Sequence, residues 1–239
     1  MNSTKDLEIL PINLIFRKPE NYKKSEINNL MTTLSGQWIG ADKSNPQTQR
    51  SPFVTNDTIT FCYNDDGELC VLGGWWEKTI NGVKIAGKTI VPGGHFERMG
   101  NRNPTITMEH GDLNFMSSAL KELWEETNID PKKIKNVKPL CLIDLAENDP
   151  RAHVLRMIWL ATTNEKPKST DEIKEFYYYK LSDLPDMIKN NSGGFVLNHD
   201  KMLEIVLGLP DFKKYVKNLK KNKSKRNKSK KNKNKKKSK

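Results

Sequence analysis

The sequence predicts an α+β protein, with a mixed sheet of strands between helices, from three observations. Residues 58–63 and 68–72 alternate apolar and polar side chains on either side of a turn, as the two strands of a hairpin do. Residues 115–127 have the apolar spacing of an amphipathic helix. Two later apolar runs, 140–145 and 154–160, indicate further strands.

The chain before the hairpin carries weak signals, and we expect residues 1–50 to be an N-terminal extension that packs on the core. The hairpin turn itself is strongly indicated by Asn64-Asp65-Asp66-Gly67. Trp75 and Trp76 follow the second strand. We expect packing at the core or sheet edge for this pair, although one ring could instead stack on a base or sugar.

Three carboxylates share one face of the predicted helix. Glu122, Glu125 and Glu126 stand at positions i, i+3 and i+4, which place side chains side by side on a helix. Leu123 belongs to the apolar flank that would pack on a sheet. Crowded carboxylates repel one another, and a hard divalent cation such as Mg²⁺, which prefers oxygen ligands, would relieve that repulsion.

Upstream of this helix, an apolar strand ends in the glycine pair Gly93-Gly94. Together, Gly94 and the segment 121–129 make the sequence resemble the Nudix hydrolase superfamily. The superfamily signature begins with a Gly and ends in Arg-Glu-apolar-x-Glu-Glu-x-Gly-apolar. Gly94 stands in the place of the first Gly, and Lys121-Glu122-Leu123-Trp124-Glu125-Glu126-Thr127-Asn128-Ile129 stands in the place of the second half.

The match departs from the signature at several places. Lys121 replaces the Arg, Asn128 replaces the last Gly, and Asp112 is the best substitute for an isolated Glu. A long insert, roughly 98–110, separates the glycine pair from Asp112, and the spacing from Asp112 to Lys121 is one residue too long. Asn tolerates the left-handed conformation of a helix end almost as well as Gly does. Lys keeps the positive charge but lacks the planar fork of Arg.

The resemblance implies an α/β/α sandwich formed by residues 51–212. It also implies hydrolysis of a diphosphate linkage in a nucleoside diphosphate joined to another group, with Mg²⁺, or Mn²⁺ in its place. Glu122 and Glu125 are the catalytic candidates, and which carboxylate acts as the base stays open. The implied metal ligands are Glu122, Glu125, Glu126, the Gly94 carbonyl and Asp112.

Two segments outside the helix favour ADP-ribose, or a related dinucleotide, as the substrate. The loop at Asp149-Pro150-Arg151 and the segment 195–203 resemble the ADP-ribose pyrophosphatase-like branch, with Asn198 in place of an Asp. In that segment His199 is expected to brace the start of a helix. The candidate substrate contacts are Arg151, His95 and Arg102, and Glu172 or Glu175 could add a ligand or base from outside the helix.

Two other functions stay open at this point. One is cleavage of capped RNA, in which a basic tail would hold the polyanion. The other is a catalytically inactive Nudix fold that binds a nucleotide or RNA. The intact Glu122, Glu125 and Glu126 argue against inactivity, whereas Lys121 keeps it open.

The positive charge of the chain is concentrated at its C-terminus. Thirteen Lys or Arg and no acid lie in residues 220–239, and subtracting them from the net charge of +12 leaves about −1 for the rest. We expect residues 213–239 to be a disordered tail. Two interpretations of this tail stay open: it is a low-complexity extension without a specific target, or it binds RNA or another polyanion, with a steep dependence on salt. Its candidate contacts include Lys220, Lys221, Lys225 and Arg226.

The three cysteines, Cys62, Cys70 and Cys141, lack the spacing of metal ligands. Their odd number and the polar N-terminus predict a cytoplasmic protein that is not secreted, with the nucleus as an alternative because of the basic tail. No segment has the length of a membrane span. The expected partner is a nucleotide-derived small molecule, and the sequence also allows a homodimer.

Overall fold

The computed structural model describes residues 13–16, 53–80, 83–90, 92–95, 115–144, 154–190 and 194–237. Most of the predicted N-terminal extension lies outside these ranges. The part that is described is strand β1, Asn13–Phe16, which pairs in parallel with β6. The division of the chain into an extension, a catalytic domain and a tail therefore stays a prediction.

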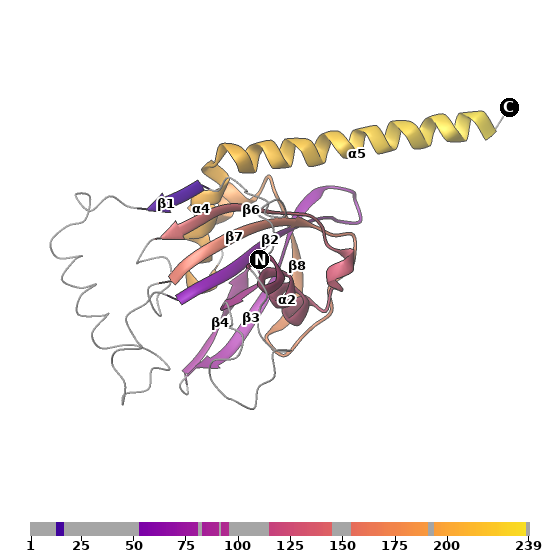
Figure 1. Cartoon of the computed structure of the whole chain (residues 1–239). Coiled ribbons are helices and arrows are strands. Elements are labelled where there is room, and N and C mark those ends of the chain that lie inside the picture. Colours follow the sequence, from indigo (N-terminus) through magenta and orange to yellow (C-terminus); the bar gives the residue numbers. More distant parts are fainter. Residues whose placement is uncertain are drawn as a thin grey trace, which may run out of the picture.

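The centre of the molecule is a mixed sheet of eight strands (Figure 1). Its path is β1-β6-β7-β2-β3-β4, with β5 paired to β2 and β8 paired to β3. The β1/β6 and β2/β7 pairs are parallel and the other pairs are antiparallel. The remaining strands are β2 Phe53–Tyr63, β3 Leu69–Ile80, β4 Val83–Thr89, β5 Gly93–His95, β6 Lys135–Asp144, β7 Val154–Thr162 and β8 Ile173–Lys180.

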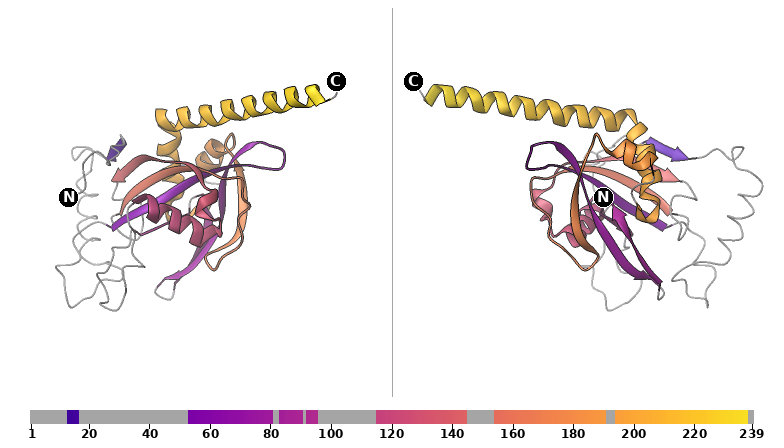
Figure 2. Two further views of the ribbon diagram at one scale, coloured as in Figure 1. Left: turned by 45° about the vertical axis from the view of Figure 1, so that its right-hand side comes forward. Right: turned by 180° about the vertical axis from the view of Figure 1, so that it is seen from behind.

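Helices cover both faces of this sheet (Figures 1 and 2). Helix α2, Phe115–Thr127, packs Leu123 against Cys62, Cys70 and Leu72 on one face. The opposite face is covered by α3 Leu184–Lys189, α4 His199–Gly208 and α5 Pro210–Lys237. Short 3₁₀ turns lie at Pro131–Lys133 and Val196–Asn198. The α/β/α sandwich is therefore confirmed.

Local sequence signals predict several of these elements, although strands β2, β3 and β6 are longer than expected. The hairpin of β2 and β3 places Cys62 opposite Cys70, and the predicted helix 115–127 matches α2. Trp76 is buried with Ile173, as core packing requires, whereas Trp75 is about one-third exposed. His199 is buried at the first turn of α4, and its Nδ1 lies 3.0 Å from the Thr89 hydroxyl, so it braces the helix start as expected.

The C-terminal segment differs from the expected disordered tail, because residues 213–237 continue helix α5. The first turns of α5 still carry an apolar stripe: Phe212 and Tyr215 are buried, with ring centroids 5.7 and 5.5 Å from that of Phe61. The Tyr215 hydroxyl also donates to the Asn136 carbonyl at 3.0 Å. These contacts, which composition alone does not reveal, hold the start of the helix on the sheet. Its later part extends away from the sandwich (Figure 2).

A second anchor joins α5 to the β2–β3 hairpin. The Lys223 ammonium lies 4.1 Å from the Tyr63 ring centroid and donates to the Gly67 carbonyl. The Tyr63 hydroxyl donates to the Leu219 carbonyl at 3.5 Å.

In the described part of the chain, no helix is both long and apolar enough to cross a membrane.

Asn128 ends helix α2 in the left-handed conformation, with a φ of 56°, as its replacement of a Gly predicts. The backbone N–H of Asn128 donates to the Trp124 carbonyl at 2.7 Å. We expect Asn128→Gly to keep stability close to wild type. Asn128→Ala should be less stable than Asn128→Gly by about 1–2 kcal/mol, because a Cβ is disfavoured in this conformation.

Urea denaturation of the two variants measures this difference. Both variants lose the side-chain contact of Asn128 with the Ser169 carbonyl, so the comparison isolates the backbone conformation. Equal stabilities for Gly and Ala at this position would contradict the assignment.

Candidate active site

The glycine pair is held at the sheet by strand pairing. Strand β5 runs antiparallel to β2, so that Gly93 lies opposite Asp57 and Gly94 lies opposite Asn56. The Thr58 amide donates to the Pro92 carbonyl at 2.9 Å and fixes the approach to this pair. The backbone of Gly93-Gly94 is therefore a rigid edge against which other groups can be placed.

Helix α2 brings two of its carboxylates onto this edge. The Gly93 amide donates to Glu126 Oε2 at 3.2 Å. The Glu122 carboxylate lies so close to Gly94 that a Cβ at that position would overlap it. The two halves of the predicted signature, which lie far apart in the sequence, thus meet in space, and the absence of a side chain at Gly94 is what permits their contact.

Glu125 lies differently from its two neighbours. Its side chain is 44% exposed, and its carboxylate is 4.0 Å from the ammonium of Lys121 in an i,i+4 pair. The structure therefore places Glu122 and Glu126, but not Glu125, against the glycine pair. The catalytic role expected for Glu125 stays a prediction.

Burial and like charges dominate the electrostatics of Glu126. Its side chain is buried, and this desolvation raises its pKa well above the ordinary value of 4.5. The charges of Glu172 and Glu122, and to a smaller extent of Asp57, raise the pKa further, whereas the hydrogen bond from Gly93 lowers it. The site thus concentrates negative charge where there is little water to screen it.

Arg156 and Asp57, which are not part of the predicted signature, also lie beside the glycine pair. Arg156 Nε lies 3.0 Å from Asp57 Oδ2, and both side chains are buried. The Asp57 carboxylate also approaches Gly93 closely enough to exclude any Cβ there. A useful signal was available, because an Arg within the apolar run 154–160 is rarely buried without a charged partner.

Asn56 is a third buried polar residue at this site that no predicted motif includes. Its amide nitrogen donates to the Ser118 hydroxyl and its amide oxygen accepts from Trp159 Nε1, both at 3.0 Å. These bonds join β2 to α2 and to β7, directly opposite Gly94. No pattern in the sequence marks Asn56, since an Asn in a strand is usually an edge or turn residue.

Glu172 and Glu175, the outer carboxylates considered for the site, lie in different surroundings. Glu172 accepts from Trp76 Nε1 at 3.2 Å and from the Lys78 ammonium at 2.5 Å, and its charge acts on Glu126. Glu175 is exposed and accepts from the Tyr177 hydroxyl at 2.6 Å. Glu172 is therefore the member of this pair that belongs to the electrostatic surroundings of the site.

Several predicted site residues lie outside the described parts of the chain. These are Asp112, Arg102 and Arg151. The backbone of His95 belongs to β5, but its side chain is not described. Of the predicted polyanion contacts, Lys220 and Lys221 lie on α5, and Lys225 and Arg226 lie in its later part, whose side chains are not described.

The chemistry of the oxygen donors fits Mg²⁺. Among the described residues, no three His, Cys, Asp or Glu side chains are gathered into a ready-made metal site. Mg²⁺ does not require one, because it commonly keeps several waters and uses one or two carboxylates together with substrate phosphates. Glu122 and Glu126 supply two such carboxylates. Burial is the main cause of the raised pKa of Glu126, and a divalent cation would offset the smaller part that comes from neighbouring negative charges.

Comparisons with known proteins give matches in structure only. No family model and no curated protein matches the chain. The Nudix domain of Shewanella oneidensis NrtR, solved with ADP ribose, is 17% identical at a TM-score of 0.46, over 73% of this chain and 94% of that one. A MutT/nudix protein from Listeria innocua is 20% identical at a TM-score of 0.42, over 65% and 92%. An Ap4A hydrolase from C. elegans is 16% identical at 0.36, over 57% and 84%.

The raised pKa of Glu126 predicts a pH-dependent stability. A carboxyl whose pKa is raised by folding contributes its full stability below its unfolded pKa, near 4.5, and this contribution is lost as the pH rises through the folded pKa. We expect Glu126→Gln to be more stable than wild type at pH 8 by about 1–3 kcal/mol in the absence of divalent cations. The difference should shrink as the pH falls toward 4.5.

Thermal unfolding in EDTA across this pH range measures the effect. The matched control is Glu125→Gln on the same helix, which should change Tm little at any pH because Glu125 is exposed. A Glu126→Gln protein that is less stable than wild type at pH 8 would contradict the raised pKa of Glu126.

Proposed function

We propose that this chain is a Mg²⁺-dependent Nudix hydrolase that cleaves the diphosphate linkage of a nucleoside diphosphate joined to another group. The observation that carries the proposal is the meeting of Glu122 and Glu126 with the glycine pair. If the acidic face of α2 were only a solvated surface, burying one of its carboxylates beside a backbone amide would cost free energy without any compensation. A site that binds a cation and a phosphate accounts for that cost.

Each residue at this site has a separate proposed role. The Gly93 amide holds one oxygen of Glu126 in place, which leaves the other available to a ligand. The buried Arg156 holds Asp57 beside the same glycine. Bound at these oxygens, Mg²⁺ supplies charge neutralisation for the diphosphate. Glu122 is our candidate for holding or accepting the proton of the attacking water, since its carboxylate lies at Gly94 in the same cluster.

ADP-ribose, or a related dinucleotide, is the proposed substrate. The support comes from the resemblances at Asp149-Pro150-Arg151 and at residues 195–203. Within the second segment, the buried contact of His199 with Thr89 gives this histidine a structural role at the end of β4, close in sequence to the glycine pair. Arg151, His95 and Arg102 are the proposed contacts for the diphosphate.

Substitution of the site carboxylates tests the proposal. Wild-type protein with Mg²⁺ should convert ADP-ribose to AMP and ribose 5-phosphate. We expect Glu122→Gln to lower kcat by about 10²-fold or more, because it removes the charge and the basicity of the carboxylate at Gly94. Glu125→Gln, tested on ADP-ribose and on other nucleoside diphosphate derivatives, decides whether the exposed carboxylate also takes part. Glu204→Gln, an exposed carboxylate on α4, should leave the rate unchanged.

The same assay separates the alternatives. Release of a methylated nucleotide from capped RNA would identify a decapping enzyme instead. The rate should then fall on deletion of residues 224–239, which keeps the buried Tyr215 and the contact of Lys223 with Tyr63. Ligand binding without turnover of any substrate would identify an inactive Nudix fold. Equal rates for wild type and Glu122→Gln would exclude the site proposed here.

A further inference from the structure

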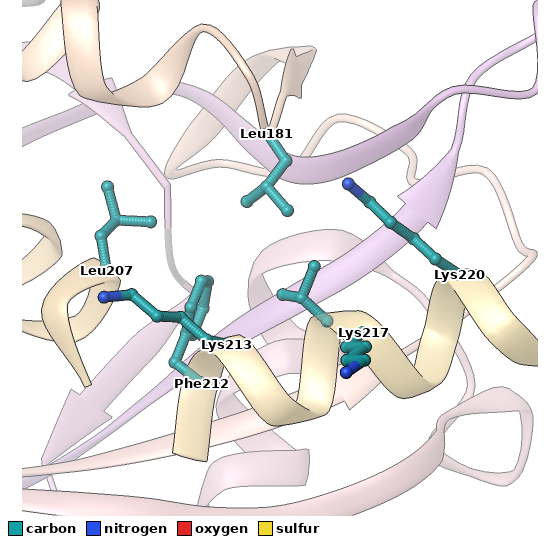
Figure 3. Close-up of a pocket in the computed structure, with 7 residues that line it drawn as sticks. Leu181, Leu207, Phe212, Lys213, Lys217 and Lys220 are labelled. Carbon is teal, nitrogen blue, oxygen red and sulfur yellow. The ribbon is translucent and has the colours of Figure 1, made fainter. Parts of the chain in front are cut away.

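A hollow lies on the face of the sheet opposite helix α2, between α5, α4 and the end of β8 (Figure 3). We call this hollow the groove. Its volume of about 400 Å³ lies within the range of ligand-binding sites, roughly 300–1,000 Å³. Its apolar lining comes from three separate elements. Leu181 follows β8, Leu207 belongs to α4, and Phe212 and Val216 belong to α5.

Three lysines of α5 line the same hollow. Lys213, Lys217 and Lys220 are spaced at i, i+4 and i+7, which places them along one side of the helix. Figure 3 shows Lys213 and Lys220 on either side of Leu181, which points toward α5. No ion pair joins these three lysines to another residue in the described part of the chain. Three lysines without an ion pair in the described part of the chain therefore lie along one side of an apolar hollow.

The apolar residues form the floor of the groove and the three lysines form its rim, and this combination favours one class of ligand. RNA could neutralise the lysines but would leave the apolar floor uncovered. Base stacking needs an exposed aromatic face, and the one aromatic ring of the lining, Phe212, is 3% exposed and packs on Phe61. A peptide that carries both carboxylates and aliphatic side chains matches both parts of the groove at once.

We propose that this groove is a docking site for an acidic peptide segment of a protein partner. Aliphatic side chains of the peptide occupy the hollow formed by Leu181, Leu207 and Val216, and its carboxylates pair with the lysines of the rim. The groove lies on the face covered by α4 and α5, whereas the glycine pair contacts α2, so the docking residues are separate from those of the proposed hydrolysis.

Fluorescence anisotropy with the full chain tests this proposal. The probe is a short fluorescein-labelled peptide made of Glu and Leu, compared with the same peptide carrying Ser in place of Leu and with an oligouridylate. We expect the Glu–Leu peptide to bind most tightly. Lys217→Glu should weaken its binding about tenfold, because a rim charge changes sign. Lys214→Glu is the matched control, since it makes the same charge change on α5 outside the groove and should alter the affinity less than about twofold.

The basic end of α5 could attract any polyanion, so the position of binding is measured as well. Amide NMR signals of Leu181 and Leu207, which lie outside α5, should shift on addition of the Glu–Leu peptide. Equal affinity for the Ser-substituted peptide, equal loss of affinity in Lys217→Glu and Lys214→Glu, or unshifted signals of Leu181 and Leu207 would each overturn the proposal. Preference for oligouridylate over the Glu–Leu peptide would replace the peptide with a nucleic acid.

Discussion

The burial of the Glu126 carboxylate beside the Gly93 amide is the interaction on which the arrangement of the site depends. One hydrogen bond offsets only part of the free energy needed to remove a carboxylate from water. The charges of Glu172 and Glu122 add to that cost. The folded chain keeps this unfavourable group because helix and sheet are held together by many other contacts.

Those other contacts form a continuous buried layer around the glycine pair. Asn56 links α2 to β7, and Arg156 holds Asp57 at Gly93. Arg156 Nη2 also donates to the Leu197 carbonyl at 3.4 Å, where Leu197 and Asn198 both adopt left-handed conformations before α4. Since non-glycine residues adopt this conformation at a cost, the bond from Arg156 helps to hold an otherwise disfavoured turn. The start of α4 on one face and the glycine edge on the other are thus connected through one guanidinium.

The two faces of the sandwich carry opposite electrostatic characters. The α2 face concentrates carboxylates at Gly93-Gly94, whereas the α5 face presents the lysines of the groove. Composition indicates a nearly neutral body with a basic C-terminal segment, and the structure divides this charge between two separate regions, one acidic and one basic. Because α5 is anchored through Tyr215 and through Lys223 on Tyr63, the lysines that line the groove are held at the body of the protein.

The sequence by itself determined the elements whose signals are local: the hairpin around Asn64 to Gly67, the boundaries of α2, and the left-handed Asn128. It also determined the association of Gly94 with the acidic helix, because a known signature links them. Only the tertiary structure decided that Glu126 is buried while Glu125 faces water, that Arg156 pairs with Asp57, and that α5 docks on the sheet. Each of these outcomes depends on which distant strand or helix lies opposite a residue, and neither helical periodicity nor composition contains that information.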